Sequence, residues 1–215
     1  MKKSKINSEK IEAAINDFEQ AVDFELVPVI AKSSTPTIHV AWVLSTLFIF
    51  ISLLIIQLVS LRQWQSWYPE TTVEMLTSVF VVDTILGFLI SRIPTVQRFF
   101  TPKHIRNHFV EMQAEHIFFK KRLFETKANQ GLLLFISTLE RRIVLLPDPR
   151  NRFHGSTKLT EEVLQIMQGH FKAAEYETGL LQAIAHLKKQ LAAKFPHTTK
   201  SFENQIPNKL IWWHE

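Results

Sequence analysis

The segment around Asp148 is the first candidate for chemistry in this sequence. Asp148 stands between Pro147 and Pro149, directly after a short apolar run. An acid at the end of a strand can bind a cation or position a water, because α/β folds often place ligand-binding loops there. The alternative interpretation is a turn residue between two prolines. Nearby arginines could bind phosphate in a fork geometry or could simply be solvated, namely Arg141, Arg142, Arg150 and Arg152.

Two histidines four residues apart, His104 and His108, are a second candidate. On a helix this spacing lets both rings face one ligand, so the pair is half of a possible zinc site. Glu111 and Glu115 continue near the same face. The pair lacks the glutamate directly after the first histidine that a metalloprotease helix requires, and the simpler interpretation is a polar helix beside a membrane. His154 is a further candidate acid–base group.

Asp83 is the most unusual residue, because it is the single charge in a long apolar run. A carboxylate at the centre of a membrane span costs about 2.5–3.5 kcal/mol on insertion scales and normally faces another helix or water. In a hairpin symmetric about Tyr68, Asp83 would lie opposite residue 53, close to Ser52. We hypothesise that a protonated Asp83 hydrogen-bonds near Ser52 or Thr84, or to the helix of a partner protein. A packing role is favoured over partner recruitment, and both over ion transport.

Two apolar runs have the length of membrane-spanning helices. The first, about 40–61, has 22 residues and no charge, and a spanning helix needs about 20 residues. The second, about 75–91, is at the short end of that range. The alternative of a buried helix in a soluble protein is disfavoured because the first run is apolar on all faces. The polar link between the runs contains aromatic residues of the kind found at lipid–water interfaces, Trp64, Trp67 and Tyr68.

Basic residues near the two runs predict their orientation. The link holds only Arg62, whereas the other ends are flanked by Lys32, Arg92, Arg98, Lys103 and Arg106. The positive-inside rule places the link outside and both flanks in the cytoplasm, as in a two-pass protein of a bacterial inner membrane. The net charge of +5 with no basic stripe fits anionic lipid headgroups and not nucleic acid. We therefore expect the lipid bilayer and a membrane protein as partners.

Composition bounds the remaining possibilities. The 215 residues are 46% hydrophobic and 21% charged, which fits a folded protein and excludes a disordered or collagen-like chain. Cysteine is absent, so the sequence allows no disulfide, cysteine-based zinc site or thiol nucleophile. Only five glycines occur and they are not clustered, so the sequence has no glycine-rich loop that would cradle phosphates.

Outside the apolar runs, the pattern predicts helices and strands of one α/β domain. Apolar residues at helical spacing predict a helix over about 8–22, and the following run over 24–31 reads as a strand. Pro28 predicts an edge position or a bulge for that strand. A helix over 102–122 should lead to two strands, 132–137 and 143–146, joined as an antiparallel hairpin. The strands 24–31 and 132–137 should be parallel, because a helix-containing crossover joins them. Two more helices are expected, over 160–168 and 174–195.

These elements predict a discontinuous domain organisation. The first flank is too short to bury a core alone, and two crossings return the chain to its starting side. We therefore expect residues 1–38 and 95–200 to form one domain, with a transmembrane hairpin over 39–94 inserted in it. Residues 201–215 are expected to be a C-terminal tail.

Several short motifs occur in an order that resembles the TPM-domain family, in its membrane-inserted branch with two spans after the first strand. They are Ile11-Glu12-Ala13-Ala14-Ile15, Phe24-Glu25-Leu26-Val27-Pro28-Val29, Gly131 to Ser137, Leu139 to Arg142, Ile143 to Asp148, and Gly179-Leu180 through Ile184 to Phe195-Pro196. The resemblance implies a compact domain with a small mixed sheet flanked by helices. It also implies either divalent-cation binding with phosphatase activity or an accessory role in membrane complexes.

The sequence departs from the family pattern before the second strand. Many members place an aspartate just before the glycine that starts this strand, where this chain reads Asn129-Gln130-Gly131. A bound Ca²⁺ requires six to eight oxygens, usually with several carboxylates, and the nearby acids are Asp148, Glu140 and Glu125. The preferred function is therefore an interaction or accessory module for assembly or maintenance of a membrane protein complex. The alternative is a membrane-anchored phosphatase assisted by Ca²⁺ or another divalent cation, with Asp148 as ligand and Arg141 or Arg150 near the phosphate.

Overall fold

The computed structural model describes residues 7–60, 69–126, 129–151, 157–173, 175–196 and 206–213. The chain divides into two compact units. We call Met1–Ser34 with Asn107–Glu215 the sheet unit, and Thr35–Arg106 the hairpin unit. The sheet unit is thus built from two separate parts of the sequence. Six residues on which sequence predictions rest lie outside the described ones: Arg62, Trp64, Trp67, Tyr68, Arg152 and His154.

The described part of the sheet unit contains a mixed sheet of four strands in the order β3-β2-β1-β4. The strands are β1 Glu25–Ala31, β2 Gly131–Ser137, β3 Arg142–Pro147 and β4 Ile211–Trp213. β1 runs parallel to β2 and to β4, and β2 and β3 form an antiparallel hairpin. The expected small mixed sheet, its parallel crossover and its hairpin are confirmed. β4 was not expected, because residues 211–213 fell in the predicted tail.

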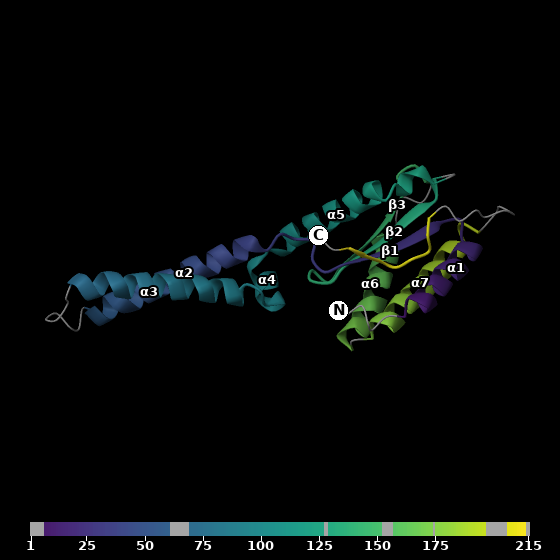
Figure 1. Ribbon diagram of the computed structural model, residues 1–215. Coiled ribbons are helices and arrows are strands. Elements are labelled where there is room, and N and C mark those ends of the chain that lie inside the picture. The colour runs from purple at the N-terminus through teal and green to yellow at the C-terminus, as the bar shows by residue number, and fades with distance from the viewer. Residues whose placement is uncertain are drawn as a thin grey trace. The chain divides into compact units, whose positions relative to one another are not determined.

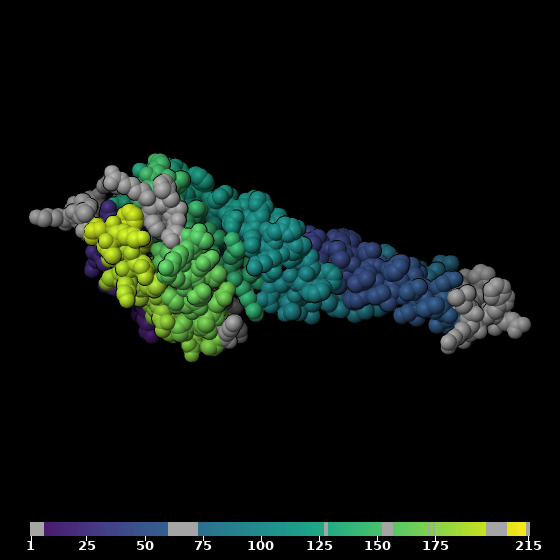
Figure 2. All heavy atoms as spheres, turned by 180° about the vertical axis from the view of Figure 1, so that it is seen from behind, coloured from purple at the N-terminus to yellow at the C-terminus, as the bar shows by residue number. Residues whose placement is uncertain are grey.

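Helices cover both faces of this sheet (Figure 1). On one face lie α1 Ser8–Ala21, α6 Thr157–Lys172 and α7 Tyr176–Ala192, and on the other lies α5 Lys103–Lys120. In the space-filling view α6 and α7 form one continuous green to yellow-green surface (Figure 2). β1 and β2 are buried along their whole length, which explains why they read as continuous apolar runs and not as alternating patterns.

Local sequence accounts for the first helix. The side chain of Asn7 caps α1 by accepting a hydrogen bond from the Glu9 backbone N–H at 3.0 Å, which satisfies one of the free donors at a helix start. Ile11, Ile15 and Phe18 form the apolar stripe of α1 and are fully buried against the sheet. The same cluster contains residues of α6 and α7, chiefly Val163, Met167, Leu180 and Leu187.

The expected edge position of Pro28 is wrong, because β1 lies between β2 and β4. The Glu25 N–H donates to Gln130 and the Ala31 carbonyl accepts from Thr138, so odd-numbered residues of β1 bond toward β2. Pro28 therefore has its ring nitrogen on the β4 side. Because its nitrogen faces away from β2, Pro28 costs the sheet no hydrogen bond to β2. Pairing with β4 begins only at Val29, opposite Ile211, so Pro28 precedes the paired residues on that side as well.

The hairpin unit consists of two long helices and one short helix. α2 Ile38–Ser60 and α3 Pro69–Ile90 pack side by side, and α4 Pro94–Phe100 follows (Figure 1). Ile38–Val59 and Val73–Ile90 are long and apolar enough to cross a membrane, and in each only 11% of the most apolar window is buried. α4 was not expected, because Pro94 was interpreted as the end of the apolar run when it is the first residue of a new helix.

Candidate functional site

Asp148 directly follows β3 and is completely buried. One residue, Arg150, engages both of its oxygens. The Arg150 backbone N–H and Nε donate to Asp148 Oδ1 at 2.8 and 3.1 Å, and Nη2 donates to Oδ2 at 2.8 Å. Hydrogen bonding from the Arg150 side chain holds the pKa of the Asp148 carboxyl below its ordinary value despite burial. The aspartate is therefore an ionised, internally paired group.

Further hydrogen bonds fix the loop after β3 to the start of β2. Arg150 Nη2 also donates to the Phe124 carbonyl, and Asn151 Nδ2 donates to the Asn129 carbonyl at 2.8 Å. Asn129 has a φ of 59°, a left-handed conformation that asparagine tolerates better than most residues. Position 131 requires glycine, because a Cβ there would lie 2.3 Å from the Leu123 carbonyl oxygen. These contacts bring Asn129, Asp148 and Arg150 together in one hydrogen-bonded cluster, which has a structural role.

This hydrogen-bonded cluster lies at the opposite end of the sheet from the usual ligand-binding end. β3 is antiparallel to β2, so its last residue lies beside the amino ends of β1 and β2, whereas ligand loops of α/β sheets follow the carboxyl ends. The expectation that Asp148 lies at a ligand-binding strand end is therefore wrong. Glu140 and Arg141, in the turn between β2 and β3, lie at the other end.

Glu140 closes that other end of the sheet. Its side chain is buried and accepts hydrogen bonds from the Ser137 hydroxyl, from the Ser34 backbone N–H at 3.0 Å and from the Ser33 hydroxyl at 3.4 Å. Arg141 adopts a φ of 54° in the turn. Glu140 therefore joins the end of β1, where the chain passes into the hairpin unit, to the β2–β3 turn.

The donor set does not fit the divalent cation that the family resemblance implies. Asp148 and Glu140 lie at opposite ends of the sheet, and Glu125 forms an exposed ion pair with Arg122 at 2.6 Å. A cation at Asp148 would have to displace the guanidinium of Arg150. His104 and His108 are exposed on α5, and the described residues contain no group of three or more His, Asp or Glu side chains that could hold a metal ion.

Asp83 is buried in the contact between α2 and α3, with 7% of its surface exposed. Its Oδ2 has no hydrogen-bond partner in the described part of the chain. The Thr84 hydroxyl instead donates to the Phe80 carbonyl of its own helix at 2.8 Å, and Ser45 donates to the Thr84 carbonyl at 3.3 Å. Asp83 therefore faces the neighbouring helix of its own hairpin.

The register between α2 and α3 differs from the expected symmetric hairpin. A Cβ on Gly87 would lie only 2.8 Å from the Ser45 Cα, and the rings of Trp42 and Phe88 are 5.7 Å apart. Residue 83 is thus placed about one helical turn away from residue 53. The expected pairing of Asp83 with Ser52 is wrong for this reason.

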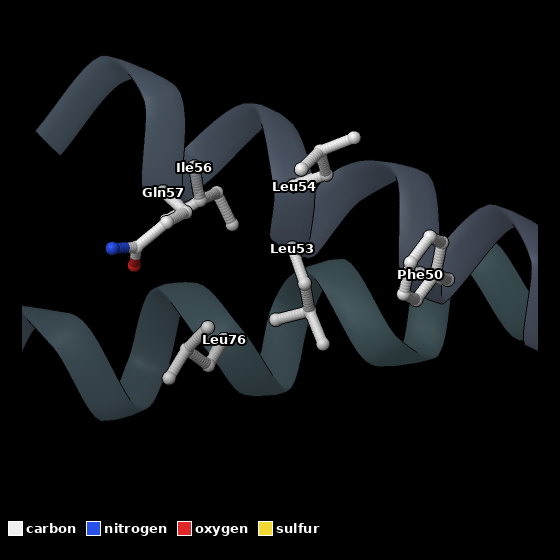
Figure 3. Close-up of a pocket in the computed structure, with 6 residues that line it drawn as sticks. All are labelled: Phe50, Leu53, Leu54, Ile56, Gln57 and Leu76. Carbon is white, nitrogen blue, oxygen red and sulfur yellow. The ribbon is translucent and has the colours of Figure 1, made fainter. Parts of the chain in front are cut away.

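A groove of about 440 Å³ is lined by residues of α2 and α3. Five residues of α2 and one of α3 line it, and Leu53 points from α2 toward α3 (Figure 3). The lining residues are Phe50, Leu53, Leu54, Ile56, Gln57 and Leu76. Because all but Gln57 are apolar, the groove fits a hydrocarbon chain or an apolar side chain and offers no catalytic group.

The sheet unit contains a buried pair of carboxylates that the sequence patterns did not predict. Glu19 is 2% exposed, and Glu25 is fully buried. Glu19 accepts from the Leu26 N–H at 3.1 Å and from Asn208 Nδ2 at 2.6 Å. Desolvation, with repulsion from Glu25, raises the pKa of Glu19 to about 8. The available signal was the position of Glu19 within the apolar stripe of α1, four residues after Ile15.

The pair ties the C-terminal segment to the sheet. The Ile206 N–H donates to Glu25 Oε2 at 3.3 Å, and Asn208 reaches Glu19 just before β4 begins. Glu25 starts β1, so both carboxylates lie beside the strand that β4 joins. Their position explains how the short β4 is held although it has only three residues.

No protein-family model and no curated protein matches this chain. Among solved structures, the NMR structure of the BA42 protein from the psychrophilic bacterium Bizionia argentinensis is similar, with a TM-score of 0.54. The two chains are 14% identical, and the match covers 99% of this chain and 95% of that chain. At this identity the likeness shows the fold alone.

Proposed function

We propose that this chain is a two-pass integral membrane protein of the TPM type, with α2 and α3 as its spans. The observation that carries the proposal is the exposure of their apolar side chains, among them Phe50 at 64% and Leu89 at 59%. A core helix of a soluble protein is mostly buried, and large exposed apolar surfaces mark membrane or protein contacts. The sheet unit keeps comparable residues, such as Phe18 and Phe24, fully buried.

Its proposed role is to assist the assembly or maintenance of a membrane protein complex, with the sheet unit in the cytoplasm. Two crossings bring both flanks to one side, and the basic residues of those flanks favour the cytoplasmic side. The interaction role is preferred because the candidate catalytic acids are engaged within the chain. Arg150 pairs with Asp148, and three serines surround Glu140.

The phosphatase alternative gains no specific support from this geometry. It requires Asp148 to bind a cation with Arg141 or Arg150 near the phosphate. Arg141 lies at the other end of the sheet, and Arg150 is the internal partner of Asp148. We expect no hydrolysis of an aryl phosphate with Ca²⁺ or Mg²⁺ above the level of Asp148→Ala. Metal-dependent turnover abolished by that substitution would establish the enzyme and contradict the accessory role.

The accessory role is tested by isolation from native membranes. The full chain should co-purify in mild detergent with one membrane protein in fixed stoichiometry, and that complex should become less abundant when the chain is deleted. The matched control replaces residues 38–90 with an unrelated two-span hairpin, which keeps the sheet unit at the membrane. A chain that purifies alone in several mild detergents and after crosslinking would contradict the proposal.

A further inference from the structure

The segment between α3 and the sheet unit has an exposed aromatic face. α4 buries none of its side chains, and Phe99 is 82% exposed. Ile93, which precedes α4, is 48% exposed. Exposed apolar residues on a short helix are unfavourable in water, but they are typical of helices that lie in the plane of a membrane interface.

Hydrogen bonds place α4 at one end of the hairpin. Gln97 Nε2 donates to the Thr37 hydroxyl at 3.3 Å, and the Thr101 hydroxyl contacts His39 Nε2 at 3.3 Å. Thr37 and His39 lie at the start of α2, while α4 follows the end of α3 after three residues. α4 is therefore level with the point where both long helices begin or end their apolar segments.

The charged residues near α4 in the sequence are all basic. From Thr84 to Val110 the sequence contains no Asp or Glu, whereas it contains Arg92, Arg98, Lys103 and Arg106. Basic residues beside a membrane span are attracted to anionic lipid headgroups. In an anionic leaflet, an aromatic side chain here would contact the acyl boundary, and the flanking basic side chains would contact the lipid phosphates.

We propose that α4 is an interfacial helix that binds anionic lipid, with Phe99 inserted below the headgroups and Arg92 and Lys103 at the level of the phosphates. This inference rests on the proposed membrane insertion of α2 and α3. It adds a lipid-recognition surface to the anchor, and it fixes the depth at which the chain leaves the bilayer.

The absence of cysteine from the chain allows a direct test with single nitroxide labels. Cysteine is introduced at Phe99, at Ile85 within α3 and at Lys121 in the sheet unit, in full-length protein reconstituted into vesicles. With phosphatidylcholine mixed with phosphatidylglycerol, we expect the label at 99 to lie about 5–10 Å below the phosphates. The label at 85 should lie deeper, and the label at 121 should be in water.

Matched variants separate the apolar and the charged contacts. A label at Thr95, one turn from Phe99, reports on Phe99→Ser, with Phe119→Ser on α5 as the control because Phe119 is also exposed. Only Phe99→Ser should raise the label toward water. Arg92→Glu with Lys103→Glu should abolish the deeper immersion of the label in vesicles that contain phosphatidylglycerol. Lys121→Glu with Lys189→Glu makes the same change of charge elsewhere and should leave that difference in depth unchanged.

The outcomes distinguish the two proposals. A label at 99 that is in water with and without phosphatidylglycerol, while the label at 85 is in hydrocarbon, would overturn the interfacial helix and leave the membrane anchor intact. Equal immersion with and without phosphatidylglycerol would overturn the recognition of anionic lipid. A label at 85 that is also in water would overturn the anchor itself.

Discussion

Asp148 and Asp83 are both buried carboxylates, but their surroundings differ. In the sheet unit Asp148 receives three hydrogen bonds from Arg150. In the hairpin unit Asp83 Oδ2 has no partner among the described residues, and the helices around it present apolar side chains outward. This difference is what we expect if the hairpin unit lies in a membrane, as proposed, and the sheet unit lies in water. The sheet unit compensates its buried carboxylate with a charged hydrogen-bonding partner, whereas the hairpin unit leaves a buried carboxylate oxygen without one among the residues that the structure describes.

The largest effect should come from removing the partner of Asp148. Arg150→Met leaves the buried Asp148 carboxylate without its counter-charge, and we expect the sheet unit to lose more unfolding free energy than a surface ion pair contributes. Hydrogen exchange of the β2 and β3 amides in detergent measures this loss. Arg122→Met is the matched control, because Arg122 pairs with Glu125 at the exposed surface, and it should cost less than about 1 kcal/mol.

Equal effects of the two arginine substitutions would contradict the structural role of Asp148. The pair also predicts a pH dependence. Because the folded pKa of Asp148 lies below its ordinary value of 3.8, the stabilisation is fully present above pH 3.8. It should be lost as the pH falls from 3.8 through the folded pKa.

Glu19 should give the opposite pH dependence within the same unit. Its pKa is raised from 4.5 to about 8, so the folded state holds a proton that the unfolded state releases. The unfolding free energy should therefore fall between pH 4.5 and about pH 8, by roughly 2–4 kcal/mol. Glu19→Gln should remove this slope in hydrogen exchange of β1. An unchanged slope in the variant would show that another group causes it.

Removing the Asp83 carboxylate from the hairpin unit should be favourable, whereas removing the partner of the Asp148 carboxylate from the sheet unit should be unfavourable. Asp83→Leu removes a buried polar group without stranding a charged partner, so we expect membrane insertion to be favoured by about 2.5–3.5 kcal/mol. A glycosylation-based insertion assay measures this change, with Asp83→Asn as the isosteric control. Lost insertion, or loss of a co-purifying protein, would show that Asp83 serves recognition and not packing.

A smaller effect should distinguish close helix packing from open helix surface. Gly87→Ala places a Cβ 2.6 Å from the Ser45 backbone nitrogen, so we expect separation of α2 and α3 at a cost of about 1–3 kcal/mol. Gly169→Ala in α6 meets nothing within 4 Å and should be neutral or stabilising by up to about 1 kcal/mol. Melting in detergent compares the two, and equal melting temperatures would contradict the close approach at Gly87.

Sequence patterns were informative where a residue's environment repeats along an element. The apolar stripe of α1 and the continuous runs of β1 and β2 have enough length to show their period and their burial. β4 has three residues and no period of its own, and it exists because β1 offers a free side at Val29 to Ala31. α4 was missed because its proline can either end one helix or begin the next.

The candidate site was predicted only in part, because its contacts join distant segments. The position of Asp148 after a strand was evident, but its pairing with Arg150 and the antiparallel direction of β3 decide its chemistry. Glu140 accepts hydrogen bonds from Ser33 and Ser34, which lie more than a hundred residues earlier in the chain. The contact of Glu19 with Asn208 likewise depends on how the C-terminal segment returns to the sheet.

Accessibility of single cysteines tests most directly whether α2 and α3 cross a membrane and leave both parts of the sheet unit on one side. Ala13→Cys, Gln65→Cys and Glu161→Cys are each expressed in a bacterial inner membrane and treated with a membrane-impermeant maleimide from outside. We expect residue 65 to be labelled in intact spheroplasts, and residues 13 and 161 only after permeabilisation. Labelling of residue 13 and residue 161 from opposite sides, or recovery of the chain in the soluble fraction, would contradict the membrane hairpin.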